Sequence, residues 1–154
     1  MSEESRATTR AGLSRAAASV GEFHAHFGLR RQALPTADIE PGLAALRVSL
    51  LEEEVGEFAD ATAARDIVEI ADALADIVYV AYGAAITYGI DLDAVLEEVH
   101  RSNMTKLGDD GKPIYRADGK VIKSANFRPP DIRQVLHDQQ PLPVDEFGLS
   151  AIDA

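Results

Sequence analysis

The chain has 154 residues, 46% of them hydrophobic, no cysteine and a formal net charge of −11 at pH 7. This length and composition suit one domain with its own core, and the absence of cysteine excludes disulfides and thiolate zinc sites. The negative charge disfavours non-specific binding to nucleic acid. The first fifteen residues lack the apolar stretch of a secretory signal, so we expect a cytoplasmic protein.

Four helices are predicted from apolar residues that recur at helical spacing. Residues 1–14 are polar and small, and we expect them to form a flexible N-terminus. Gly28, Gly89 and Gly108 are expected to end helices, and Asp91 to cap the start of the fourth. The helices expected on these grounds span about residues 14–27, 43–63, 67–88 and 92–106.

A β-hairpin is predicted over about residues 112–123, because Asp118-Gly119 is a strong two-residue turn signal between alternating residues. Two strands alone are marginally stable, so this hairpin should lie against helices or another subunit. One or two helical turns are expected over residues 131–137, followed by a loose tail over residues 138–154. The expected fold is therefore mainly α: a four-helix core within residues 15–137, a small C-terminal β-hairpin and an extended tail.

Six carboxylates lie on the second and third predicted helices, three on each. At about 100° per residue, each set of three falls on one side of its helix. Like charges at this spacing destabilise a helix, and Arg65 is the only base among them. Two antiparallel helices would bring both sets to one cleft, where Mg²⁺ can neutralise them through carboxylate oxygens. The carboxylates are Glu53, Glu54 and Glu57 on one helix and Glu69, Asp72 and Asp76 on the other.

The opposite sides of these two helices are apolar. The residues expected to be buried there are Leu51, Val55, Phe58, Leu74, Ile77 and Val78. Residues 67–90 form the longest apolar stretch of the chain. Three of the six carboxylates fall within this stretch, which argues against a membrane span. No membrane partner is therefore expected.

Charge is unevenly distributed along the chain. Residues 40–98 hold fourteen acids and two bases, whereas residues 101–133 hold eight bases and four acids. This pattern fits a site for metal ions plus an anion, and a polyphosphate is the natural anion of this kind. Metals held in such a site polarise phosphoryl oxygens and lower the pKa of a bound water. Bases available for the substrate's remaining charge are Lys106, Lys112, Arg116, Lys123 and Arg128.

Two motifs and a C-terminal segment resemble a known group of proteins. The run Glu53-Glu54-Val55-Gly56-Glu57, followed by Glu69-Ile70-Ala71-Asp72, is similar to the E-E-x-x-E…E-x-x-D signature of the all-α nucleoside triphosphate pyrophosphohydrolases. That superfamily contains MazG-like proteins, dimeric dUTPases and phosphoribosyl-ATP pyrophosphohydrolases. Residues 98–106 and 110–131 resemble the E-V-H-x-x-N-M-x-K and D-G-K-P-I-Y-R…P-P-D segments of a phosphoribosyl-ATP-pyrophosphohydrolase-like subgroup. The resemblance covers about residues 20–133.

The resemblance implies a MazG-like four-helix fold and a hydrolase that cleaves nucleoside triphosphates between the α and β phosphates. The products are a nucleoside monophosphate and pyrophosphate, and the cofactor is Mg²⁺, with Mn²⁺ as a possible substitute. Family members assemble as dimers or dimers of dimers, so we expect a homodimer or a homotetramer. The substrate implied is a nucleoside triphosphate.

The resemblance also implies roles for individual residues. One of Glu53 and Glu54 activates the water. Asp76 lies beyond the quoted motif and is a further ligand, a group beside the ligands or a cap partner. The implied metal ligands are Glu53 or Glu54, Glu57, Glu69 and Asp72. The implied substrate-binding residues are Asn103 and Lys106, with Lys123, Asn126 and Arg128 as further candidates.

Several alternatives stay open at this point. The leading interpretation is nucleotide-pool sanitation, with a dUTP-like substrate possible, and the second is hydrolysis of phosphoribosyl-ATP. A third is a non-catalytic acidic helical oligomer that binds nucleotides or a partner protein. The carboxylates can also form an ordinary solvated helix face. In the alternative interpretation of the bases from Lys112 to Arg128, they do not bind substrate and only balance the charge of the acidic helices across a subunit contact.

Overall fold

The structure, a computed structural model, describes residues 12–148 and confirms a mainly α fold. Residues 1–11 of the expected flexible N-terminus (residues 1–14) and the last six residues of the expected tail lie outside this range. Within it there are five helices and one two-stranded antiparallel sheet. The elements are α2 (Arg15–His26), α3 (Pro41–Ala64), α4 (Ile67–Tyr88), α5 (Leu92–Met104), β1 (Ile114–Tyr115), β2 (Val121–Ile122) and α6 (Ile132–Asp138).

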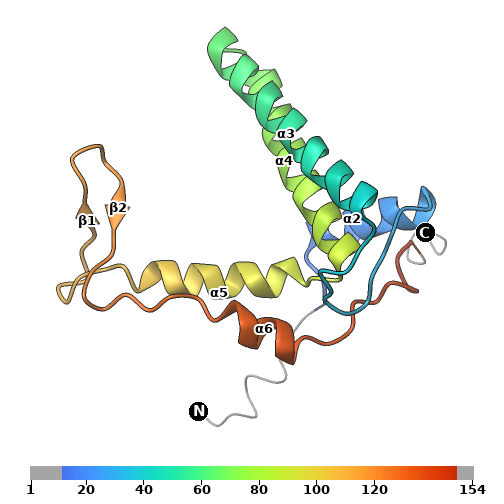
Figure 1. Cartoon of the computed structure of the whole chain (residues 1–154). Coiled ribbons are helices and arrows are strands. Elements are labelled where there is room, and N and C mark those ends of the chain that lie inside the picture. The colour runs from blue at the N-terminus through green and yellow to red at the C-terminus, as the bar shows by residue number, and fades with distance from the viewer. Residues whose placement is uncertain (1–11, 149–154) are drawn as a thin grey trace.

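Helices α3 and α4 form a long antiparallel hairpin that projects from the rest of the molecule (Figure 1). Pro41 begins α3, where its fixed φ suits the first helical turn. The connection is short because Arg65 adopts a left-handed conformation, with φ of 57°. Asp66 then begins α4, and its side chain accepts hydrogen bonds from the backbone N–H groups of Val68 and Glu69. These local signals fix where the hairpin turns.

The core lies at the base of this hairpin, where α2 packs against α4. Its buried residues are Ala17, Val20, Tyr82, Ile86 and Phe147. The start of α2 is tied to the start of α5, because Ser14 donates from both its backbone N–H and its hydroxyl to Asp93 at 2.8 Å. Tyr82 also donates to Asp93, at 2.7 Å. One carboxylate therefore joins α2, α4 and α5.

Two basic side chains cross the base of the hairpin at Gly83. Arg47 donates to the carbonyl of Val80 at 2.9 Å, and His24 is 2% exposed with its Nδ1 3.0 Å from the carbonyl of Arg30. A Cβ at position 83 would lie against the ends of both side chains, so glycine makes this crossing possible. Burial lowers the pKa of His24 and that of Arg47. The crossing fixes α2 and α3 against α4.

Helix α5 leads away from the base to a small β-hairpin. Residues 105–130, which we call the arm, contain β1 and β2, paired Ile114 to Ile122 and Tyr115 to Val121. Arg128 fastens the foot of the arm: its N–H donates to Thr105 Oγ1 and its carbonyl accepts from Ser102 Oγ, both at 2.8 Å. The arm lies at one end of α5 and the α3–α4 hairpin at the other, and both project to the same side (Figure 1).

The described part of the expected loose tail, up to residue 148, packs onto the base. Gln139 is buried, accepts from the N–H of Asp91 and donates to the carbonyl of Gly89, both at 2.8 Å. Phe147 lies against α2 at Gly21, where any Cβ would come within 2.6 Å of the ring. Sequence periodicity does not detect such an isolated anchor, because an extended segment leaves no repeating pattern.

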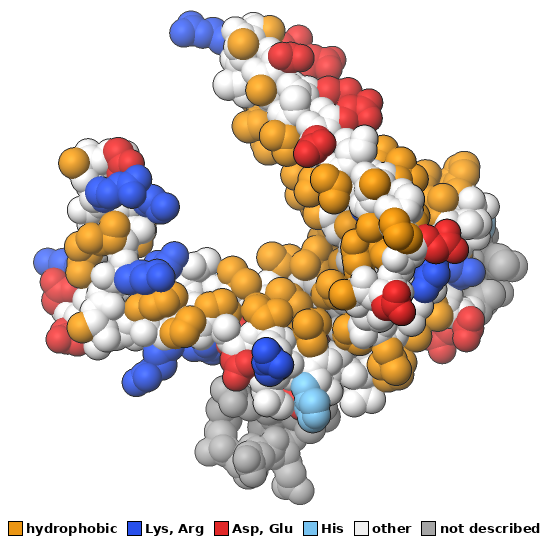
Figure 2. All heavy atoms as spheres, in the orientation of Figure 1, with side chains coloured by type: hydrophobic (Ala, Val, Ile, Leu, Met, Phe, Trp, Pro, Cys, Tyr) orange, Lys and Arg blue, Asp and Glu red, His pale blue; other side chains and the backbone are white. Residues whose placement is uncertain are grey.

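The prediction that the apolar sides of the α3–α4 hairpin are buried within the chain is wrong for three of its six residues, whereas Leu51, Phe58 and Ile77 are half-buried. Val55 is 51% exposed, Leu74 46% and Val78 49%. Two helices bury only the stripe along their own contact, and the described part of the chain leaves much of the remaining apolar side uncovered (Figure 2). By length and composition alone α4 is also apolar enough to cross a membrane, as some core helices are.

Candidate metal site

Three carboxylates converge halfway along the α3–α4 hairpin. One oxygen from each of Glu54, Glu57 and Asp76 lies within 4.8 Å of the other two. Glu54 and Glu57 are three residues apart and so share one side of α3. Asp76 faces them because it stands eleven residues after Arg65, just as Glu54 stands eleven before it. Residues equally far from the turn of an antiparallel hairpin lie at the same height.

The electrostatics of this group favour a bound cation. Burial, followed by repulsion from Glu57 and Asp76, raises the pKa of Glu54 above its usual value. Its Oε2 is buried without a hydrogen-bond partner. None of the ion pairs among the described residues involves these three carboxylates. Oxygen ligands at this spacing suit Mg²⁺ or Mn²⁺, so the donor set fits a hard divalent metal.

The other predicted ligands lie outside this group of three. Glu53 is exposed beside it, near enough for its charge to raise the pKa of Glu54. Asp72 is one helical turn nearer the connection than Asp76, about 6 Å along the axis, and Glu69 is about 10 Å nearer. Both are exposed. The structure therefore brings together Glu54, Glu57 and Asp76, while roles for Glu69 and Asp72 stay predictions.

The predicted substrate-binding residues lie at the far end of α5 and in the arm. Asn103 is exposed near the end of α5, and Lys106 follows it, half-buried. Asn126 donates to Asp109 at 2.7 Å, and Lys123 places its Nζ 4.6 Å from the centre of the Phe127 ring. These contacts hold the foot of the arm together. Within one chain the structure does not bring these residues to the three carboxylates (Figure 1).

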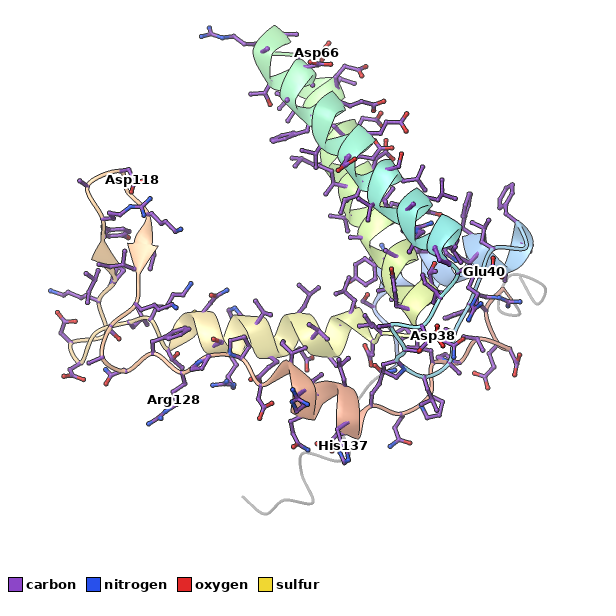
Figure 3. All side chains as sticks on the ribbon, in the orientation of Figure 1. Asp38, Glu40, Asp66, Asp118, Arg128 and His137 are labelled. Carbon is purple, nitrogen blue, oxygen red and sulfur yellow. The ribbon has the colours of Figure 1, made fainter. Side chains whose placement is uncertain are left out.

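Two further charged residues of the second motif have structural partners. Glu98 accepts two hydrogen bonds from Arg101, at 2.7 and 2.8 Å, and one from the N–H of Asp131. The Arg101 bonds, followed by that backbone bond, lower the pKa of Glu98 to about 2. Arg128 is one of the predicted substrate-binding residues, and its side chain points away from the α3–α4 hairpin (Figure 3). Glu98 thus holds the start of α6 against α5.

A helical hairpin with converging carboxylates defines a class of all-α proteins with a candidate divalent-metal site. The sequence matches the family described as phosphoribosyl-ATP pyrophosphohydrolase over residues 20–103, from α2 to the end of α5. The chain therefore belongs to the phosphoribosyl-ATP pyrophosphohydrolase family, within the MazG-like nucleoside triphosphate pyrophosphohydrolase superfamily. This is a family of hydrolases that act on phosphoanhydride bonds of nucleotides.

The chain is also similar to a viral protein. It is 34% identical over 109 residues to the uncharacterized protein L479 of Acanthamoeba polyphaga mimivirus. That stretch covers 69% of this chain but 41% of the viral protein, so the chain spans less than half the length of this relative. The match to the family ends at residue 103, so the arm lies beyond it.

Replacing Glu54 tests the electrostatics of the site. In chelator at pH 7, Glu54→Gln is expected to raise Tm by about 1–3 °C, because each like-charge pair removed is worth a few tenths of a kcal/mol. The raised pKa of Glu54 means that its ionised form destabilises the fold above that pKa. The gain should therefore shrink as the pH falls towards 4.5, the ordinary value for glutamate.

Thermal unfolding with chelator and with Mg²⁺, across this pH range, is the measurement. Saturating Mg²⁺ should raise the Tm of the wild-type protein and not that of Glu54→Gln. Glu52→Gln is the matched control, since Glu52 is exposed and outside the group of three carboxylates. A Mg²⁺-induced rise of equal size in Glu54→Gln would contradict the assignment of this carboxylate.

Proposed function

We propose that the protein is a Mg²⁺-dependent nucleoside triphosphate pyrophosphohydrolase that acts in nucleotide-pool sanitation. It converts a nucleoside triphosphate and water into the monophosphate and pyrophosphate. The observation that carries the proposal is the convergence of Glu54, Glu57 and Asp76 within 4.8 Å, in a chain of this hydrolase family. Mn²⁺ is an alternative ion with the same ligand preference.

The residues of the site divide the work as follows. Glu54, Glu57 and Asp76 would hold the metal, which when bound would supply a Lewis acid for the phosphoryl oxygens and lower the pKa of a bound water. Glu53, exposed at the edge of the group, accepts the proton of the attacking water. Attack at the α-phosphorus expels pyrophosphate. Phosphoryl transfer needs mainly positioning and charge neutralisation. The carboxylates can neutralise the phosphates only through cations that they bind.

A second substrate is favoured by the family itself. The matching family is described by its action on phosphoribosyl-ATP, which carries the same triphosphate linkage. The site residues described above would serve either substrate, because a metal held by carboxylates acts on the triphosphate that both substrates carry. Turnover of phosphoribosyl-ATP, compared with that of dUTP and the common triphosphates, separates the two possibilities.

Pyrophosphate release from a panel of dNTPs, NTPs and phosphoribosyl-ATP tests the proposal. Metal-dependent release from one or a few of these compounds is expected with Mg²⁺ or Mn²⁺, and none in chelator. Release from none of them at millimolar Mg²⁺ would overturn the proposal and favour a non-catalytic acidic helical protein that binds nucleotides or a partner protein.

A further inference from the structure

His24 is a titratable side chain enclosed in the base of the molecule, where α2 packs against α4 (Figure 1). The residue is 2% exposed, and its Nδ1 lies 3.0 Å from the carbonyl oxygen of Arg30. A carbonyl oxygen only accepts hydrogen bonds, so Nδ1 must carry a hydrogen and donate it. In the neutral ring this leaves Nε2 without a proton.

The Nε2 atom of this ring lies beside a second base. A Cβ at position 83 would meet both His24 Nε2 and the guanidinium of Arg47, so the two side chains end beside the same backbone atom. Arg47 is held there by its hydrogen bond to the carbonyl of Val80. It keeps its charge, because arginine does not lose its proton in proteins. A proton on Nε2 would therefore place a second positive charge beside the first, where solvent barely reaches.

The charged groups that act on His24 are bases. Arg47 reaches it from α3 and Arg31 from the segment after α2, while α4 contributes the backbone at Gly83. Burial lowers the pKa of His24 most, the hydrogen bond to Arg30 opposes this effect, and the two arginines lower the pKa further. No carboxylate of the described residues is among these groups, so nothing there balances the charge that a proton would bring.

His24 also fastens residues 27–40, which we call the α2–α3 loop. Beyond the bond to its first residues, this loop continues to two other parts of the base. The N–H of Gln32 donates to the carbonyl of Ile86 near the end of α4, at 3.0 Å. The carbonyl of Ala33 accepts from the N–H of Leu142 in the C-terminal tail, at 2.8 Å. A change at His24 can therefore reach α4 and the tail through the loop.

We propose that His24 makes the base of the molecule an acid-sensitive latch. The neutral ring holds α2, the α2–α3 loop and Arg47 together, and the base is closed. In acid a proton on Nε2 opposes Arg47, the ring leaves its place, and the loop and the tail are released together. The middle of the α3–α4 hairpin makes no contact with this ring, so its helices stay formed. The opening is a local unfolding of the base and does not involve the carboxylates.

Proton linkage gives the direction of the effect. The closed base favours the neutral ring, whereas in the opened base the ring is in water and binds a proton near its ordinary pKa of 6.5. The closed base is therefore fully stable above this pH and loses stability as the pH falls below it. As long as only the opened form binds the proton, each pH unit favours opening by up to about tenfold.

Amide hydrogen exchange of the wild-type protein between about pH 5 and 8 tests the latch. The protection factors of the Gln32 and Leu142 N–H groups, corrected for the intrinsic exchange rate, should be constant above pH 6.5. Below it they should fall by up to about tenfold per unit, while amides in the middle of α3 and α4 keep their protection. Constant protection throughout, or an equal fall in α3 and α4, overturns the proposal.

His24→Gln assigns the effect to this ring. The glutamine amide can donate to the carbonyl of Arg30 and does not titrate, so the acid-dependent loss of protection at Gln32 and Leu142 should disappear. His137→Gln is the matched control, because it changes an exposed ring on α6, and it should retain the wild-type pH dependence. A His24→Gln protein that also retains this dependence overturns the assignment.

Titration of the ring nitrogens by NMR in the wild-type protein decides the proposal even if His24→Gln does not fold. We expect a neutral His24 ring with its hydrogen on Nδ1, and a pKa below that of the exposed His137. Arg47→Gln removes the opposing charge and should bring the pKa of His24 closer to 6.5. A pKa of His24 at or above 6.5 in the wild-type protein, or one that Arg47→Gln leaves unmoved, overturns the latch.

Discussion

Asp76→Asn should reduce pyrophosphate release at least about 100-fold and abolish the effect of Mg²⁺ on thermal stability, because it removes one of three converging ligands. Asparagine has nearly the same shape as aspartate, so the helix and its packing are retained. The measurements are kcat/KM on the preferred nucleotide, a Mg²⁺ titration of Tm, and circular dichroism to confirm the fold.

Asp72→Asn is the informative companion to this variant. It makes the same chemical change one helical turn nearer the connection, at an exposed residue outside the group of three carboxylates. We expect it to reduce activity less than Asp76→Asn. Full activity with unchanged Mg²⁺ dependence in Asp76→Asn, together with an inactive Asp72→Asn, would falsify the register of the site.

Gly89→Ala should lower the free energy of unfolding by about 2–5 kcal/mol and Tm by roughly 5–15 °C. Two effects add. Gly89 ends α4 with φ of 74°, a conformation that an L side chain rarely adopts. A Cβ there would also lie 2.2 Å from the carbonyl oxygen of Leu34, in a backbone segment that cannot rotate aside.

That segment is held firmly over the end of α4. Gln32 and Thr36 donate their N–H groups to the carbonyls of Ile86 and Tyr88, at 3.0 and 2.9 Å, so the clash at Gly89 also disturbs the cap of the helix. Gly42→Ala is the control, because nothing lies within 4 Å of its Cβ position, and its Tm should change little. Thermal and urea unfolding measure both variants, and a Gly89→Ala protein as stable as wild type would contradict the described contact.

Local signals in the sequence predicted most of the secondary structure. Asp118-Gly119 predicted the β-hairpin, and Gly119 has φ of 86°. The predicted two-residue turn is wrong, because the N–H of Arg116 donates to the carbonyl of Lys120 and the connection spans residues 117–119. Asp91 predicted the start of α5, and its side chain accepts from the N–H of Ala94. Each of these signals works over a few residues of the chain, so the sequence alone reveals it.

Features that depend on distant parts of the chain were not predicted. The approach of Leu34 to Gly89, the crossing of Arg47 at Gly83 and the anchoring of Phe147 at Gly21 each join segments far apart in sequence. Periodicity places residues on the sides of a helix and does not say which partner covers them. The half-exposed Val55 shows the result, since its helix was predicted but its side chain is 51% exposed.

The candidate site was predicted only in part from the sequence. The acidic motifs indicated a metal site, but helical spacing alone left the pairing of the two helices undefined. Counting outward from the connection at Arg65 would have set Asp76 opposite Glu54. The arm could not be related to the carboxylates in this way, because its position depends on the direction in which α5 leaves the base (Figure 1).

The anchoring of Phe147 on α2 has a consequence for how the protein is made. The ring that fills the space beside Gly21 belongs to Phe147, which is synthesised long after the whole of α2 (Arg15–His26). The α3–α4 hairpin depends mainly on contacts between neighbours in sequence and can form early on the ribosome. The base, by contrast, closes only after Phe147 has been made, so the nascent protein exposes the apolar surface of α2 until synthesis has passed this residue.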